Sequence, residues 1–137
     1  MKILSLDHLV LTVRNVDASV DFYTNVLGME LCVFGNNRKA LSFGAQKINL
    51  HQFTREFEPK ADSPTPGSAD LCFLTRTPMI EVISELQSKQ VEIIEGPVQR
   101  TGAAGPILSV YFRDPDQNLI EVSNQITLIK NAPRIKV

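Results

Sequence analysis

The sequence is poor in cysteine and in net charge, and each shortage excludes a class of protein. Among its 137 residues are two cysteines, Cys32 and Cys72, which lie in apolar, strand-like surroundings and do not form a CxxC pair. A disulfide framework is therefore not expected, and buried, reduced thiols are the simpler interpretation. The formal net charge of −1 gives no reason to expect a nucleic acid or an anionic membrane as partner.

Long hydrophobic runs are also missing. No apolar stretch approaches the roughly 20 residues that cross a bilayer. Met1 to Leu6 lead directly into a strand pattern, without the features of a secretory signal. We therefore expect a cytoplasmic protein. The chain length suits one domain, and the apolar fraction of 43% supplies a core of ordinary size.

The first half of the chain has a strand, a helix and three further strands. Residues 6–13 (LDHLVLTV) alternate between two sides, which predicts a strand. Asn15 follows as a helix N-cap, and apolar residues at helical spacing continue to Leu27, before Gly28 ends the helix. The three further strands are predicted at residues 31–34, 40–43 and 47–53.

Residues 56–67 (EFEPKADSPTPG) hold three prolines and form the clearest connector, after which the pattern restarts. A helix is predicted to begin at the N-cap Thr77, with Pro78 in its first position. The predicted strands of this half are residues 69–75, 91–94, 107–113 and 118–123.

The two halves repeat each other at an offset of 62 residues. Asn15 lies seven residues after His8, and Thr77 lies seven residues after Asp70. A half of this size is marginal alone, so the halves should bury their sheets together or against a partner chain. We predict one α+β domain of two tandem βαβββ modules. Its parts are module one at about residues 4–55, a linker at 56–67, module two at 68–124 and a C-terminal tail at 125–137.

Four residues are candidates for metal ligands. The two histidines, His8 and His51, both fall within predicted strands, although a lone strand histidine is more often structural. The repeat pairs His8 with Asp70, and aligning residues 50–52 with residues 120–122 pairs His51 with Glu121. All four carry donor atoms that metals use. Burying the Glu121 carboxylate in an apolar strand is costly without a metal or a partner. The opposite interpretation, that Glu121 faces solvent or pairs with an arginine, has equal weight.

Residues 99–106 (QRTGAAGP) are the other notable segment. Their glycines allow the backbone to approach a ligand, and Arg100 suits an anionic group, although a surface connector is the more ordinary interpretation. Ser109 and Tyr111 alternate along the next strand. Tyr111 either lines a cleft or packs in the core. We take Arg100 and Tyr111 as candidate substrate-binding residues.

Two motifs resemble one known family. The opening DHLVLTV, followed by FYTNVLGM in the first helix, and the closing FRDPDQNLIEV resemble the vicinal oxygen chelate superfamily. That superfamily includes glyoxalase I, extradiol dioxygenases, and fosfomycin-resistance and bleomycin-resistance proteins. The resemblance covers roughly residues 4–124 and is nearest to lactoylglutathione-lyase-like glyoxalase-domain proteins. It implies a curved mixed sheet with a central cleft, where strand residues hold a divalent metal ion (Ni, Zn, Mn or Fe(II)).

The resemblance also implies the ligand set. The superfamily's first-strand histidine falls on His8 and its last-strand glutamate on Glu121. The ligand that ends the first half falls on His51, or on Asn49 if the register shifts by two residues. The remaining ligand, usually histidine, falls on Asp70, and this departure leaves the metal and the exact reaction open.

The implied activity is that of a glyoxalase I-like lyase or isomerase. Its substrate would be small and oxygenated, and a glutathione-linked compound is one candidate. Glu121 would move a proton. A homodimer is implied by the resemblance as well. The ligand types also permit an extradiol ring-cleaving dioxygenase, in which two histidines and one carboxylate bind Fe(II). A metal-free drug-binding protein and a fold kept for protein interaction are the remaining alternatives.

Overall fold

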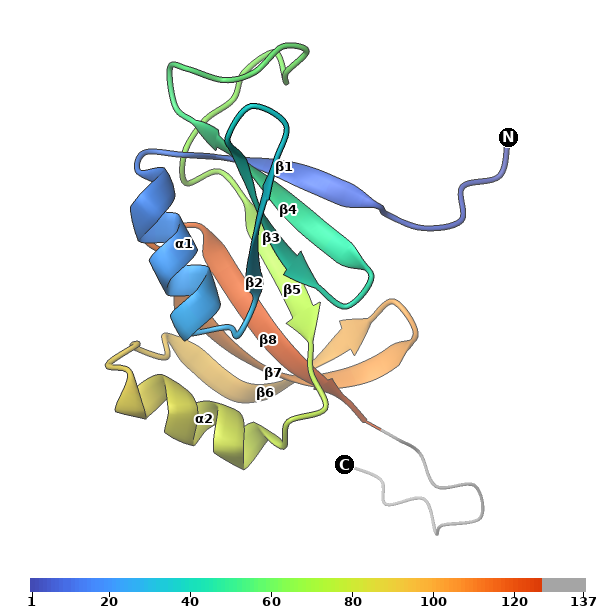
Figure 1. Cartoon of the computed structure of the whole chain (residues 1–137). Coiled ribbons are helices and arrows are strands. Elements are labelled where there is room, and N and C mark those ends of the chain that lie inside the picture. The colour runs from blue at the N-terminus through green and yellow to red at the C-terminus, as the bar shows by residue number, and fades with distance from the viewer. Residues whose placement is uncertain (127–137) are drawn as a thin grey trace, which may run out of the picture.

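The computed structural model describes residues 1–126, so the tail beyond Ile126 lies outside the described residues. Two four-stranded sheets and two helices make up the described chain, which confirms the α+β prediction (Figure 1). Module one contains β1 (His8–Val13), α1 (Val16–Asn25), β2 (Glu30–Phe34), β3 (Arg38–Phe43) and β4 (Gln46–Gln52). Module two contains β5 (Asp70–Leu74), α2 (Met79–Ser88), β6 (Glu95–Gly102), β7 (Gly105–Arg113) and β8 (Leu119–Gln125).

The two sheets have the same topology. The strand orders are β1-β4-β3-β2 and β5-β8-β7-β6. In each sheet the first strand of the module pairs in parallel with the last, and the remaining pairs are antiparallel. β1 and β5 are therefore edge strands of their sheets.

Two local predictions for module two were wrong. The strand expected at residues 91–94 is absent, and β6 begins instead at Glu95, so the expected connector at residues 99–106 is mainly the β6–β7 hairpin. Its turn lies at Ala103 and Ala104. The second helix begins one residue later than expected. Pro78 is its N-cap and makes no side-chain cap, whereas Asn15 caps α1 by accepting a hydrogen bond from the Ala18 amide.

A single core joins the modules, and it lies on the helix-facing sides of both sheets. In module one, Leu11 and Ile48 contribute to this core, and in module two Val110 and Phe112 do so. Because strand side chains alternate, residues of the other parity lie on the opposite sides of the two sheets. We call these opposite sides the outward faces.

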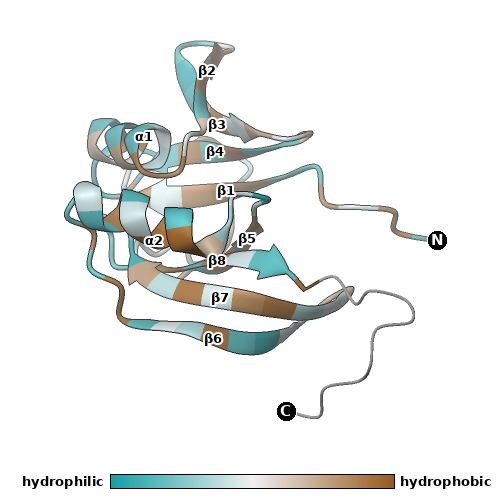
Figure 2. Cartoon of the chain, turned by 90° about the horizontal axis from the view of Figure 1, so that it is seen from below, coloured by the Kyte–Doolittle hydropathy of each residue, from teal (hydrophilic) through white to brown (hydrophobic). Residues whose placement is uncertain are grey.

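Direct contacts between the modules fix this arrangement. The Phe22 ring of α1 lies 6.3 Å from the ring of Phe112 on β7. The two helices lie beside each other, and Lys89 after α2 donates a hydrogen bond to the carbonyl of Asn25, the last residue of α1 (Figure 2). Neither described helix has the length and apolar character that a membrane span requires.

Candidate metal and substrate site

The strand registers show which residues of the two modules are equivalent. On β1 and β4, Val10 pairs with Asn49, and on β5 and β8, Cys72 pairs with Glu121. His8 and Asp70 each stand two residues before those positions. The repeat partner of Glu121 is therefore Asn49, and the pairing of His51 with Glu121 was wrong by two residues. A slip of two keeps every side chain on the same face, so alternation alone does not detect it.

His8 and Asn49 lie together on the outward face of module one. The Nδ1 atom of His8 lies 2.8 Å from the Asp7 carboxylate. Because a carboxylate only accepts hydrogen bonds, Nδ1 is the donor in this contact, and Nε2 is the ring nitrogen left to face a ligand. Asn49 is buried, and its Oδ1 atom has no hydrogen-bond partner within residues 1–126. A buried, unsatisfied amide oxygen is destabilising unless a cation or a ligand binds it.

Asp70 and Glu121 occupy the equivalent positions on the outward face of module two. The Ser109 hydroxyl donates to Oε2 of the half-buried Glu121 at 2.6 Å, and the Ser123 hydroxyl lies 3.4 Å from the same oxygen. Both serine hydroxyls contact Oε2, which leaves Oε1 available to a ligand. Glu121 is thus neither fully exposed nor paired with an arginine in the described chain.

Tyr111 and Arg100 share this face with Glu121. Tyr111 is the direct strand partner of Glu121, so it lines the face and does not pack in the core. Arg100 Nε donates to the Tyr111 hydroxyl at 3.1 Å, and its guanidinium also donates to Glu95 at 2.9 Å. Burial raises the pKa of Tyr111, and the Arg100 hydrogen bond opposes that rise. Tyr111 is therefore a neutral phenol. It accepts a hydrogen bond from Arg100, and its own hydroxyl hydrogen remains available to donate a hydrogen bond to a ligand.

These residues line a cavity of about 510 Å³ on module two. Cys72 and Leu74 of β5 form one wall, and Thr101 to Ala104 of the β6–β7 hairpin form another. Burial raises the pKa of the Cys72 thiol, so it is protonated at neutral pH. The cavity thus combines apolar walls with a few convergent polar groups, as small-molecule sites do.

His51 lies apart from His8 on the same strand pair. It pairs with Thr12, four residues along the ladder from the pairing of His8 with Lys47, which corresponds to roughly 13 Å. The imidazole is 2% exposed, its Nε2 atom lies 3.3 Å from the Arg38 guanidinium, and its ring contacts the Phe57 ring at 5.5 Å. Burial, and then the Arg38 charge, lower the pKa of His51. The residue is a neutral imidazole under the connector.

The connector after β4 covers this end of module one. Phe57 lies under the Arg38 guanidinium at 4.5 Å, and Lys60 pairs with Glu56 at 3.6 Å. Together with Thr12 and His51, several connector residues, among them Pro59, Lys60 and Ser63, line a cavity of about 500 Å³. None of the described residues that line this cavity carries a carboxylate, and none of them lines the cavity beside Glu121.

One chain does not bring the two donor pairs together. Within residues 1–126 there is no group of three or more His, Cys, Asp or Glu side chains that could hold a metal ion. The reason is the packing. Both sheets turn their helix sides to the shared core, so the face with His8 and the face with Glu121 both point away from it. The structure places His8 and Asn49 on one face, two residues apart along the ladder, and it places Arg100, Tyr111 and Glu121 around one cavity.

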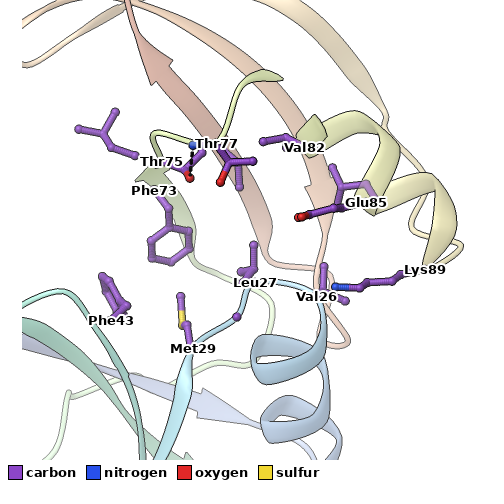
Figure 3. A pocket seen from close by; sticks show the side chains of 14 residues that line it. Val26, Leu27, Met29, Phe43, Phe73, Thr75, Thr77, Val82, Glu85 and Lys89 are labelled. Atoms are coloured by element: carbon purple, nitrogen blue, oxygen red, sulfur yellow. Dashed lines mark hydrogen bonds between the residues drawn. The ribbon is translucent and has the colours of Figure 1, made fainter. Parts of the chain in front are cut away.

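A third cavity, of about 400 Å³, lies between the two helices (Figure 3). Met29, Phe43 and Phe73 form its apolar part, and Glu85 and Lys89 of module two also line it. It lies on the helix side of the sheets, and none of the predicted site residues lines it. The predicted site residues lie instead on the outward faces.

Two relatives show what the chain is similar to. It is 60% identical over 121 residues to virulence protein STM3117 of Salmonella typhimurium, which covers 88% of this chain and 84% of that protein. The crystal structure of STM3117 matches with a TM-score of 0.91 at 59% identity, over 92% of this chain and 100% of that chain. The glyoxalase domain-containing protein RDO1 of Mycosarcoma maydis is 56% identical over 124 residues, which cover 90% of this chain and 70% of that protein.

More distant proteins share the fold. The structure of lactoylglutathione lyase from Agrobacterium tumefaciens matches with a TM-score of 0.69 at 20% identity, over 90% of this chain and 95% of that chain. The model of the Glyoxalase/Bleomycin resistance protein/Dioxygenase superfamily matches residues 5–122, which is most of the chain. This match confirms the resemblance of the opening and closing motifs. The chain belongs to the Glyoxalase/Bleomycin resistance protein/Dioxygenase superfamily.

Proposed function

We propose that the chain is a metal-dependent enzyme, a lyase or isomerase of glyoxalase type, whose site forms between two copies of the chain. The observation that carries this proposal is the pair of matching half-sites. His8 with Asn49, and Asp70 with Glu121, stand at equivalent positions on two outward faces. Each face offers two donors, and a protein metal site commonly uses three or four.

A two-fold dimer would complete the site. In such a dimer the same two patches meet twice, so module one of each copy faces module two of the other. The charges favour this pairing. The outward face of module one carries Arg38 and Lys47 against Glu30, and that of module two carries Asp70, Glu95 and Glu121 against Arg100 and Arg113, so the two faces have small net charges of opposite sign. Complementary charges guide two such faces together.

The residues fit a divalent metal ion. The combined donors are one imidazole nitrogen, one amide oxygen and two carboxylates, and the unsatisfied Asn49 oxygen is one of the four. Among Ni, Zn, Mn and Fe(II), a set this rich in oxygen favours Mn²⁺. His51 is not in the set that we propose, because of its distance from His8 along the ladder.

The roles of the other groups follow from their positions. A bound metal ion would supply Lewis acidity toward a substrate carbonyl. The Glu121 carboxylate, oriented by the Ser109 hydroxyl, accepts the proton from the carbon beside that carbonyl and returns it to the neighbouring carbon. Tyr111 donates a hydrogen bond to the developing oxyanion and keeps its proton, and Arg100 fixes the phenol in place. Since Arg100 already meets Glu95, an anionic group on the substrate would compete with that carboxylate.

The geometry supports the alternatives less well. A ring-cleaving dioxygenase binds iron through two histidines and one carboxylate, and His51 lies too far from His8 to complete that set. A metal-free drug-binding protein would not account for the unsatisfied Asn49 amide oxygen on the face that carries His8. Turnover of a glutathione hemithioacetal, compared with catechol-dependent oxygen uptake, separates the two enzyme reactions.

Metal loading tests the proposal. We expect wild-type protein to bind about one Mn²⁺ per chain, and Glu121→Gln or Asn49→Leu to weaken binding by roughly 100-fold or more, since the first neutralises a carboxylate ligand and the second removes an amide ligand. His51→Gln is the matched control and should bind metal like the wild type. Wild-type protein that takes up no stoichiometric Mn, Zn, Ni or Fe(II) would overturn the proposal. Metal lost in His51→Gln but kept in Asn49→Leu would overturn the ligand set.

A further inference from the structure

The first six residues form an exposed apolar arm in front of β1. Met1, Ile3, Leu4 and Leu6 are between 58% and 115% exposed. The arm leaves the body of the molecule beyond the start of β1, and a hydrogen bond from Gln46 to the Leu6 carbonyl attaches its end (Figure 1). Large apolar side chains crowded into one exposed segment mark a contact surface. We call residues 1–6 the N-terminal arm.

A matching apolar edge lies on module two. β5 is the outer strand of its sheet, and within residues 1–126 no strand pairs with its free edge. Leu74 near the end of β5 is 58% exposed, and it lines the cavity beside Glu121 together with Cys72. An uncovered edge with an exposed leucine is a template for another extended segment.

We propose that the N-terminal arm lies along the β5 edge of a second copy and closes that copy's substrate cavity. This inference rests on the proposed function, from which it takes that His8 of one copy meets Asp70 of the other. His8 and Asp70 are equivalent positions on equivalent edge strands, so a two-fold relation between the modules makes these two edges antiparallel.

The register of the arm follows from that arrangement. In an antiparallel pair with His8 opposite Asp70, Leu6 stands opposite Cys72, and Leu4 stands opposite Leu74. Leu4 and Leu6 have the same parity as His8, so they lie on the face that carries the ligands. Each copy thereby supplies two leucines to the rim of the other copy's cavity of about 510 Å³. The apolar cover keeps water from the proton transfer at Glu121.

Cross-linking between engineered cysteines tests this contact. In a background with Cys32→Ser and Cys72→Ser, one chain carries Leu4→Cys and another carries Leu74→Cys. Mild oxidation of the mixture should give covalent dimers of the two different chains, because the paired positions lie within disulfide range. Leu4→Cys mixed with Leu31→Cys is the control, since Leu31 is exposed on the other module. No excess of the Leu4–Leu74 product over the control product would overturn the inference. In a chain that carries both substitutions, a disulfide that forms mainly within one chain, and not between two chains, would also overturn the inference.

A second variant tests the energetic role of the arm. Leu4→Asp with Leu6→Asp should raise the dimer dissociation constant by roughly 100-fold, because two apolar contacts are lost and two charges are placed in the contact. An unchanged dissociation constant contradicts the inference. The two proposals fail separately. If the cross-links form but no metal binds, the arm contact is retained and the metal site is rejected. If two chains share a metal site but no cross-links form, only the arm contact is rejected.

Discussion

Module one presents an imidazole and an amide on its outward face, whereas module two presents two carboxylates at the equivalent positions. The surroundings also differ. The connector covers the His51 end of module one, and module two keeps an open cavity beside Glu121. Glu121 accepts a hydrogen bond from Ser109, and Asn49 Oδ1 accepts none within the described chain. The duplicated ladder thus carries two unlike donor pairs, and the proposed metal site joins one of each.

The largest expected effect comes from breaking the contact that holds the halves together. Asp114, in the turn after β7, accepts hydrogen bonds from the Tyr23 hydroxyl at 2.6 Å and from the side chain of Asn118 at 2.8 Å. Its backbone partners are the amides of Asp116 and Asn118. Asp114→Ala leaves these buried donors unpaired and should cost about 3–5 kcal/mol of unfolding free energy.

Denaturant unfolding measures this loss. Arg113→Ala next door is the control, because Arg113 is exposed and should change stability by less than about 0.5 kcal/mol. Equal, small effects for the two variants would show that the turn of the closing motif does not hold the modules together.

Ser109→Ala sharpens the comparison between the half-sites. The substitution removes the hydroxyl that orients Glu121, so Mn²⁺ affinity should fall by roughly 10-fold, while the fold stays intact. Ser42→Ala on the outward face of module one is the matched control and should leave affinity unchanged. Affinity lost equally in both variants would mean that the serine does not act through Glu121.

The N-caps of α1 and α2 provide a second comparison between the two modules, this time of helix stability. Asn15→Ala removes the side-chain cap of α1 and should cost about 1 kcal/mol in thermal or denaturant unfolding. Thr77→Ala at the equivalent position should cost less, since α2 has no side-chain cap. A larger loss for Thr77→Ala would contradict this assignment of the caps.

The smallest expected effect is a pH dependence in module one. The pKa of His51 is lowered in the folded state, so between that pKa and the unfolded value of about 6.5 the unfolded chain binds more protons. The free energy of unfolding should therefore fall as the pH drops through about 6.5. His51→Gln should flatten this slope in urea unfolding measured across the range. A variant that keeps the wild-type slope would show that a group other than His51 causes the pH dependence.

Much of the fold could be predicted from alternation and from turn residues, and the prediction failed where those signals are weak. β6 (EGPVQRTG) has one large apolar residue and a proline, as edge strands tolerate, so its composition resembled a loop. The N-cap of α1 was predicted correctly because an Asn precedes an apolar period. Thr77 has the same sequence context, yet its carbonyl accepts a hydrogen bond from Asn124, a residue distant in the sequence.

The candidate site was harder to predict for two reasons. Period-two alternation places Asn49 and His51 on one face alike, and only the ladder with β1 shows which of them lies near His8. The outward direction of both faces depends on packing between the modules, such as Phe22 against Phe112 and Phe43 against Phe73. No local pattern contains that information. Nor does any sequence pattern indicate that the Asn49 amide oxygen is buried without a partner.

The central claim, that each metal site takes His8 from one copy and Glu121 from the other, is tested most directly by mixing two inactive variants. His8→Ala and Glu121→Ala chains, unfolded together and refolded, form mixed dimers in which one site lacks both ligands and the other is intact. We predict that the mixture regains about one quarter of the wild-type Mn²⁺ stoichiometry, while each variant alone binds none. No recovery in a mixture shown to contain mixed dimers, or full metal binding by either variant alone, would contradict the account.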